Sequence, residues 1–487
     1  MDSLISDLQI LIRQPSISAT SEGLEQCAIL LANLMENAGI HSELFYLDVV
    51  DRTENRNSNR VPPIVFGEVK SKSNPDSKTI LFYNHYDVQP VDPIEKWNED
   101  PFSGKVIGNL IYGRGSSDDK GELITRLKAV EFFLKKAVDV PCNIKFLIEG
   151  EEEIGSPNLS KYIQKFKPKL GSDLVIWESG YVDKDERAII SLGQKGILNT
   201  EIAVYGPSRD IHSSLAVAIE NPAWKLVNLL SLLYDPKDGK ILIDGWYDEV
   251  KALSERELQL LADEPFNDEA FKKEYGIDNF INNQNSYDIK KALAIEPSCN
   301  ISGLSSGYTK RGVKTILPSS ATAKLDFRLV PDMDPKIQFE KLVKYLRTRG
   351  FSEKEISIKY LSGEPAYRTP IDNQYLKLIV DSASKIFNGV ILNLSSSGTG
   401  PMYIFKEILD VDSICIGSTT LPNKMHSPNE FTNLDLLHKG TNCFIEIIKN
   451  FASTSATAAT THSTASSAYT DLHISNNNNN SMNNNVN

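Results

Sequence analysis

Apolar residues at the start of the chain recur at helical spacing. Leu4, Leu8 and Ile12 fall on one face of a helix, and the pattern stops before Pro15, so a helix is predicted over residues 4–12. A second pattern of the same period predicts a helix over residues 24–37, which closes at Gly39. The chain therefore opens with two predicted helices.

The pattern then changes to short, nearly continuous apolar runs at residues 79–83, 143–148, 174–177 and 413–416. Such runs are typical of strands buried on both faces. Helical patterns at residues 122–136 and 375–386 lie between some of them. Alternating strands and helices predict an open, mostly parallel α/β sheet that has helices on both faces.

A different pattern occupies residues 198–361. Strands are predicted at 199–204, 322–330 and 356–360 and helices at 222–234 and 335–348, whereas residues 235–295 are rich in charge and give no clear assignment. Because 487 residues exceed what one hydrophobic core usually serves, we expect two domains. The smaller, two-layer α/β domain would span 198–361 and interrupt a catalytic domain formed by 1–197 and 362–452.

The C-terminal segment, residues 453–487, runs through Ser, Thr and Ala into two Asn-rich tracts. Its apolar content is too low to offset the conformational entropy of folding, so the segment is predicted to be a disordered tail. His462 and His473 lie in it and are not candidate ligands.

Composition narrows the class of protein. The formal charge of −12 argues against nucleic-acid binding, which needs clustered Lys and Arg. No apolar stretch reaches the roughly 18 to 20 residues that span a bilayer, and the first residues are acidic where a secretory signal is basic. The five cysteines are scattered and odd in number, which is typical of reduced core thiols. We expect a cytoplasmic protein with neither nucleic acid nor membrane as a partner.

Polar residues that could bind a metal or transfer a proton lie where the predicted strands end. Ligands of open α/β sheets bind outside the carboxyl ends of the strands. A further acidic pair, Asp118-Asp119, precedes the helix that begins near Gly121. The polar residues at or after the strand ends are His85, Asp87, Glu152, Glu153, Glu178 and His426. All of them are expected to converge on one rim.

Two imidazoles and three carboxylates in this set could bind two divalent ions. The proposed ligands are His85, Asp118, Glu153, Glu178 and His426. Zinc is the expected metal, with manganese and cobalt as alternatives, because the set contains no thiolate. Asp87 could hold the second ring nitrogen of His85. Glu152, beside a ligand, is free to act as a general base and then to protonate the leaving nitrogen.

Each motif also has a purely structural interpretation. A single His after a strand is more often a structural residue than a ligand, Asp118-Asp119 could cap the following helix, and three successive Glu residues usually form a solvated turn. The metal-site hypothesis rests on coincidence: two of the five histidines outside the tail follow predicted buried strands beside acidic residues.

Longer motifs show a resemblance to M20 metallopeptidases, in particular to the cytosolic nonspecific dipeptidase and carnosinase branch. The motifs are His85-Tyr86-Asp87-Val88-Gln89-Pro90, Tyr112-Gly113-Arg114-Gly115-Ser116-Ser117-Asp118-Asp119-Lys120-Gly121, Glu152-Glu153-Ile154-Gly155-Ser156, Gly312-Val313-Lys314-Thr315-Ile316-Leu317-Pro318 and Arg328-Leu329-Val330-Pro331. The resemblance spans about residues 1–450. It implies that the inserted unit is a lid and dimerisation domain.

The resemblance also implies a ligand set. His85, Asp118 and Glu178 would hold one ion, and Asp118, Glu153 and His426 the other, so Asp118 bridges and Asp119 has no ligand role. Glu152 matches the general base and Asp87 the residue that orients His85. Glu178 departs from the dipeptidase branch, which commonly has Asp at that position, and matches deacylases and some carboxypeptidases instead.

Four residues at or beyond the insert match further roles in the family. His212 matches a histidine that reaches the active site of a neighbouring subunit and stabilises the oxyanion, which implies a homodimer. Arg328 matches a residue that receives the substrate carboxylate, and Thr315 and Thr399 match substrate-contacting positions. From pattern alone, His212 could be an ordinary polar residue starting a helix, and Arg328 could pair with Asp326 on the same strand face.

These observations predict a dinuclear metal-dependent hydrolase of dipeptides or short peptides. One alternative on the same fold is an N-acyl-amino-acid deacylase, of the acetylornithine deacetylase or succinyl-diaminopimelate desuccinylase type, which Glu178 favours. A second is a noncatalytic relative that only binds metal or ligand, and Glu152 argues against it because a binding protein has no need for an unliganded base.

Overall fold

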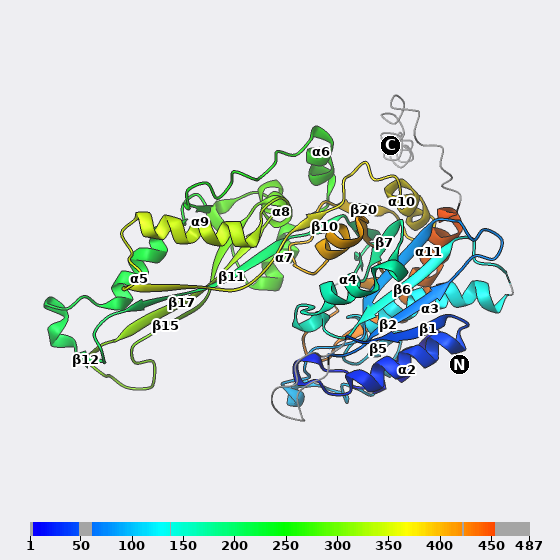
Figure 1. Ribbon diagram of the computed structural model, residues 1–487, viewed down its shortest axis with the longest axis horizontal. Coiled ribbons are helices and arrows are strands. Elements are labelled where there is room, and N and C mark those ends of the chain that lie inside the picture. The colour runs from blue at the N-terminus through cyan, green and yellow to red at the C-terminus, as the bar shows by residue number, and fades with distance from the viewer. Residues whose placement is uncertain (1–2, 48–60, 137, 421–422, 453–487) are drawn as a thin grey trace, which may run out of the picture.

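The computed structural model describes residues 3–47, 61–136, 138–420 and 423–452, and the predicted tail at 453–487 lies outside them. Figure 1 shows a large α/β part on the right and an extended sheet that projects from it to the left. In the large part, the strands of a mostly parallel sheet alternate with helices, and helices pack on both faces of the sheet. This confirms the expected fold class.

The central sheet contains the four predicted buried strands side by side, in the parallel order β6-β3-β7-β21. Shorter or antiparallel strands extend it at both edges, while β20 pairs with β9. The strands are β1 (His41–Phe45), β2 (Ile64–Val69), β6 (Asn143–Glu149), β3 (Thr79–His85), β7 (Leu174–Trp177), β21 (Ser413–Cys415), β9 (Ala188–Ser191), β8 (Tyr181–Val182), β22 (Thr419–Thr420) and β20 (Val390–Asn393).

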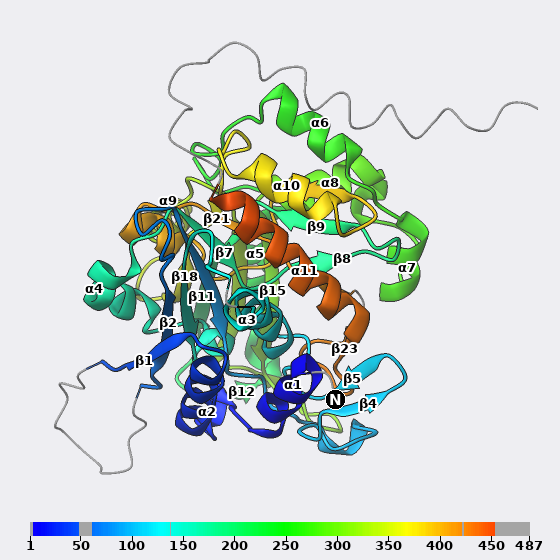
Figure 2. The ribbon, with the colours of Figure 1, turned by 90° about the vertical axis from the view of Figure 1, so that its right-hand side faces the viewer.

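Both faces of this sheet are covered, because successive side chains of a strand point to opposite faces. Phe82 and Ile176 pack into one core with the helices α1 (Ser3–Arg13), α2 (Leu24–Asn37), α3 (Lys120–Lys135), α10 (Leu376–Ser384) and α11 (Leu434–Phe451). Their neighbours Tyr83 and Trp177 pack into a second core with α4 (Leu159–Leu170) and the turn η6 (Phe405–Leu409). Figure 2 shows α11, α3 and α1 on the face nearest the viewer.

Smaller elements complete this part. Three short strands form a separate sheet in the order β23 (Phe431–Asn433), β5 (Leu110–Tyr112), β4 (Lys105–Ile107). Short helical turns lie at η1 (Ser18–Thr20), η2 (Ile94–Lys96) and η3 (Glu152–Ile154). The last of these follows β6 directly and carries two of the predicted site residues.

The projecting part is a four-stranded antiparallel sheet with its own core. Its order is β15 (Ser298–Ser306), β17 (Ser320–Leu329), β11 (Gly196–Tyr205), β18 (Ile356–Glu364), and the helices α5 (Pro222–Ser231) and α9 (Pro335–Thr348) cover one face. At its far end lie β12 (Ile211–His212), β16 (Ile316–Leu317) and the turn η4 (Ser213–Val217). We call this part the insert, and we propose that it is the inserted domain expected at 198–361.

The segment that the sequence left unassigned folds against the junction of the two parts (Figure 1). It forms the ribbon β13 (Tyr234–Asp235) and β14 (Lys240–Ile241), the helices α6 (Glu255–Asp263), α7 (Asp268–Tyr275) and α8 (Ser286–Ile295), and the turn η5 (Ile281–Asn283). Polar N-caps such as the capping box at Ser254 and Glu257 begin these helices.

The insert is connected through a two-stranded antiparallel ribbon of β10 (Gly193–Gln194) and β19 (Tyr367–Arg368). The chain therefore leaves and re-enters the central part at adjacent positions. Within the described ranges, no helix combines the length and the apolar character needed to cross a membrane.

Candidate metal centre and active site

The five proposed ligands converge because four come from the carboxyl ends of sheet strands or the loops after them. His85 is the last residue of β3, Glu178 follows β7, and Glu153 lies in the turn after β6. His426 follows β22, and Asp118 lies just before α3. Residues far apart in the sequence thereby meet at one rim of the sheet.

Asp118 lies between the two imidazoles. Its Oδ1 is 3.0 Å from His85 Nε2, and its Oδ2 is 3.0 Å from His426 Nε2. Burial raises the pKa of the Asp118 carboxyl, but the bonds to both histidines outweigh it, and the net pKa is lowered. Hydrogen bonds that the protonated ring of His426 donates to the carboxylates of Asp118 and Glu153 raise the pKa of His426 to about 10. One oxygen directed at each imidazole is the arrangement expected of a carboxylate that bridges two ions.

The other two carboxylates complete the site from opposite sides. Glu178 Oε2 is 3.6 Å from His85 Nε2, and Glu153 Oε2 is 3.2 Å from His426 Nε2. Glu178 Oε2 and Glu153 Oε1 are buried without a hydrogen-bond partner among the described residues. Buried anionic oxygens are costly unless a cation or donor satisfies them. These oxygens and the two imidazoles therefore fit hard or borderline divalent cations.

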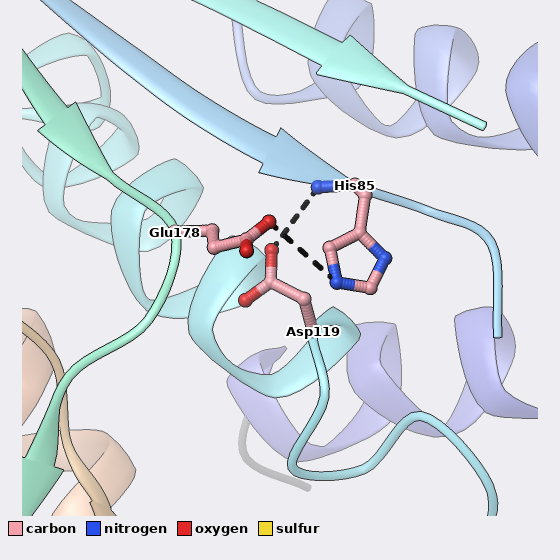
Figure 3. Close-up of side chains that lie close together, drawn as sticks. All are labelled: His85, Asp119 and Glu178. Atoms are coloured by element: carbon pink, nitrogen blue, oxygen red, sulfur yellow. Dashed lines mark hydrogen bonds and ion pairs between the residues drawn. The ribbon is translucent and has the colours of Figure 1, made fainter. Parts of the chain in front are cut away.

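Asp119 also lies at the centre. Figure 3 shows it with His85 and Glu178, and one ligand atom from each lies within 4.8 Å of the others. A second group of the same kind is His85, Asp118 and Glu153. Asp119 Oδ2, however, accepts hydrogen bonds from the backbone N–H of His85 at 3.2 Å and from Asn84 Nδ2 at 2.6 Å. Burial raises the pKa of Asp119 to about 7. These bonds hold the end of β3 against the start of α3.

Asp87 contacts both parts of the site. Its Oδ1 is 3.4 Å from His85 Nδ1, and its backbone carbonyl lies 3.0 Å from the same ring nitrogen. Its two carboxylate oxygens accept the backbone N–H groups of Glu152 and Glu153 at 3.2 and 3.1 Å. Asp87 thus fixes the ring of His85 and the turn after β6 at once.

Glu152 lines a cavity of about 660 Å³ that also contains Asp118, Glu178 and His426. A volume of this size accommodates a small ligand. Burial, with nearby negative charges, raises the pKa of the Glu152 carboxyl well above its ordinary value. A carboxyl group in this setting is able to accept a proton from a reacting group and return it.

Sequence reasoning missed Arg126, a fully buried side chain on α3. Its Nη2 donates to the carbonyls of Trp177 and Glu178, each at 2.6 Å, and its Nη1 to the carbonyl of Tyr83 at 2.8 Å. The guanidinium therefore ties the carboxyl end of β3 to that of β7. A buried Arg inside an apolar helical pattern was the available signal, since Arg is rarely buried without partners.

Glu430 was also missed, and it holds the loop that carries Asp118. It is fully buried and accepts hydrogen bonds from Arg114 Nη1 at 2.7 Å and from the backbone N–H groups of Gly115, Ser117 and Asp118 at 2.9 to 3.1 Å. The available signal was an acidic residue four positions after His426, beside an arginine motif that needed a counter-charge.

His212 and Thr315 lie away from this centre, at the far tip of the insert (Figure 1). His212 is exposed, and its Nδ1 is 2.7 Å from Ser214 Oγ. The carbonyl of Thr315 accepts the N–H of Ser213 at 3.1 Å, so the two residues are close to each other. Neither could contact a ligand at the candidate metal centre of its own chain.

Thr399 lies at the cavity instead, and Arg328 lies beside Thr399. Arg328 Nη1 donates to Thr399 Oγ1 at 2.7 Å, and Thr399 lines the cavity. Asn300, rather than Arg328, hydrogen-bonds Asp326, at 3.0 Å. The contact joins β17 of the insert to the loop before η6.

Comparisons with known proteins identify the family. The sequence matches Peptidase family M20/M25/M40 over residues 81–450. Human Beta-Ala-His dipeptidase is 29% identical over 397 residues, 79% of this chain and 76% of that protein. The Cys-Gly metallodipeptidase of Schizosaccharomyces pombe is 28% identical over 407 residues, 81% of this chain and 84% of that protein.

Among solved structures, the M20 family metallo-carboxypeptidase Sso-CP2 from Sulfolobus solfataricus superposes with a TM-score of 0.81 at 37% identity. The match covers 93% of this chain and all of that one. Human carnosine dipeptidase 1 gives a TM-score of 0.74 at 26% identity, covering 93% and 97%. The chain is a hydrolytic enzyme that belongs to peptidase family M20/M25/M40.

Proposed function

We propose that this protein is a metallopeptidase that hydrolyses dipeptides or other short peptides with a free C-terminal carboxylate. The observation that carries the proposal is Asp118, which directs one oxygen at each of two imidazoles beside the cavity that Glu152 lines. The names of the relatives support peptide substrates.

Two divalent ions would complete the site. His85, Asp118 and Glu178 would hold one, and Asp118, Glu153 and His426 the other, with zinc the expected metal and manganese or cobalt as alternatives. When bound, the ions supply Lewis-acid chemistry, which polarises the scissile carbonyl and makes water more acidic. Asp87 keeps His85 oriented, because it contacts Nδ1 while Nε2 faces the site.

Other side chains would transfer the proton and bind the substrate carboxylate. Glu152 takes a proton from the attacking water as its oxygen bonds to the carbonyl carbon, and later delivers that proton to the departing nitrogen as the C–N bond breaks. Arg328, with Thr399 beside it, receives the substrate carboxylate. The Arg fork would fix the register of the peptide relative to the metals.

We also propose a homodimer. His212 and Thr315 lie too far along the insert to serve their own site, and the resemblance places the equivalent histidine in the active site of a neighbouring subunit. A symmetric pair would deliver each insert tip to the other chain. Five free cysteines, four of them buried, support a reducing, cytoplasmic location.

A substrate panel tests the function. Purified protein reconstituted with Zn²⁺, Mn²⁺ or Co²⁺ is assayed on dipeptides, C-terminally amidated dipeptides, and N-acetyl and N-succinyl amino acids. We expect free dipeptides to have the highest kcat/KM. Faster turnover of the acyl amino acids would replace the proposal with a deacylase, and equal turnover of the amidated peptides would refute the role of Arg328.

A further inference from the structure

Arg328 has a charged neighbour on the same face of the insert sheet. Arg328 on β17 and Glu364 on β18 both pair with Ile197 on the intervening strand β11. Residues directly opposite one another on neighbouring strands point to the same face. With strands about 4.8 Å apart, the two Cα atoms lie roughly 10 Å from each other in one row.

Glu364 faces the cavity, which it lines together with Thr399 and Gly155. Its carboxylate is half-buried, and it makes no hydrogen bond or ion pair with the residues that the structure describes. Burial raises the pKa of this carboxyl, and the charge of Arg328 opposes the rise. The Glu364 carboxylate is half-buried and has no partner, and it lies near the Arg that is proposed to bind the substrate carboxylate. Such a group repels anions and is stabilised by a cation, so it suits a cationic part of the substrate.

We propose that Glu364 selects substrates whose C-terminal residue carries a cationic side chain, lysine or arginine. The inference rests on the proposed function, because it assumes that Arg328 holds the C-terminal carboxylate. The metal centre belongs to the central part of the molecule, whereas Arg328 and Glu364 both belong to the insert. The group that Glu364 contacts therefore lies on the same residue as the carboxylate, beyond the bond that is cleaved.

Glu264, which directly follows α6, is another carboxylate that lines the cavity, and its surroundings differ from those of Glu364. Glu264 Oε1 accepts a hydrogen bond from Asn393 Nδ2 at 2.9 Å, and the ammonium of Lys290 donates to the backbone carbonyl of Glu264 at 2.6 Å. Burial raises the pKa of the Glu264 carboxyl, and the bond from Asn393 and the charge of Lys290 oppose the rise. Glu264 is therefore a matched control: a carboxylate of the same cavity that already has a partner.

The experiment compares Ala-Lys with Ala-norleucine, which has the same four-carbon stem without the ammonium group. Wild type, Glu364→Gln and Glu264→Gln are assayed at equal metal content. We expect wild type to prefer Ala-Lys, and Glu364→Gln to lower the ratio of kcat/KM for the two substrates roughly 10-fold, chiefly through KM, because a hydrogen bond to a charged group is lost. Glu264→Gln should leave the ratio unchanged.

Two results would overturn the inference. If the ratio is unchanged in Glu364→Gln, Glu364 does not contact the side chain of the substrate's C-terminal residue. If kcat/KM rises equally for both substrates, Glu364 only moderates the charge of Arg328. Product inhibition of the wild type needs no variant: free lysine must inhibit more strongly than norleucine. If wild type cleaves neither dipeptide, the proposed function fails as well, whereas cleavage of both with an unchanged ratio refutes only this inference.

Discussion

Replacing Glu430 by glutamine removes one charge from a buried cluster while keeping the size of the side chain. In the native protein each carboxylate oxygen of Glu430 accepts two hydrogen bonds. Oε2 accepts from the guanidinium of Arg114 and the backbone N–H of Gly115, and Oε1 accepts from the backbone N–H groups of Ser117 and Asp118. The amide of glutamine has a single acceptor oxygen, and its NH₂ group would face two N–H donors. If the oxygen stays on Arg114, the N–H groups of Ser117 and Asp118 lose their acceptor.

The expected cost follows from burial. Arg114 and Glu430 are 1% and 0% exposed, and breaking a buried ion pair at one partner costs about 3–5 kcal/mol. At about 2 °C per kcal/mol for a large domain, Tm should fall by roughly 6–10 °C. Because the loop that loses its anchor carries Asp118, metal affinity should fall as well.

Thermal unfolding followed by circular dichroism, with metal content measured in parallel, tests this expectation. The control is Glu446→Gln, which breaks ion pairs to the half-exposed Lys385 and Lys449 and should cost at most about 1 kcal/mol. If Glu430→Gln shifts Tm no more than this control does, the cluster does not hold the loop and the reasoning is wrong.

Four further outcomes are expected. Glu152→Gln should lower kcat by about 10²–10⁴-fold at unchanged metal content; activity near wild type would refute its role as the base. Arg328→Lys should lower kcat/KM on free dipeptides about 10-fold or more, since the bidentate fork is lost, and amidated dipeptides should be unaffected. Mixing inactive His212→Ala with inactive Glu152→Gln should restore about a quarter of the activity by random exchange in a dimer, whereas no recovery would exclude shared sites. Chelation should lower Tm by several degrees, and Zn²⁺ should restore it, because ions that bind only the folded state stabilise it.

The sequence predicted helices and strands correctly where a local pattern of apolar residues is enough to determine the element. Residues 24–37 and 335–348 form helices with the predicted bounds. In each, the amphipathic pattern is accompanied by a residue that marks a helix end: Gly39 after the first helix and Pro335 in the first turn of the second. The four buried runs form neighbouring parallel strands, because apolar residues on both faces leave a strand no exposed position. The convergence of His85, Glu153 and Glu178 followed from that order, because each lies at or just after the carboxyl end of one of these strands, whereas their roles as ligands stay a prediction.

Other features depended on contacts that no local pattern contains. Strand β15 was missed because its exposed face and Ser-rich sequence lack an apolar signal, and only pairing with β17 defines it. Arg126 and Glu430 reach partners that are up to several hundred residues away. The expected domain boundaries at 197/198 and 361/362 fall inside β11 and β18, because both strands continue past the residues with strong apolar alternation.

The ribbon of β10 and β19 makes the insert a detachable module. Gly193 pairs with Arg368 and Gln194 with Tyr367, so the two ends of the insert are one hydrogen-bonded pair apart. A two-residue hairpin turn could bridge them. The shortened protein would keep each proposed metal ligand but lose Arg328, Glu364 and His212. In engineering terms, the proposed metal-binding scaffold and the proposed substrate-recognition segment are separable in the gene, so the segment could be exchanged while each proposed metal ligand is kept.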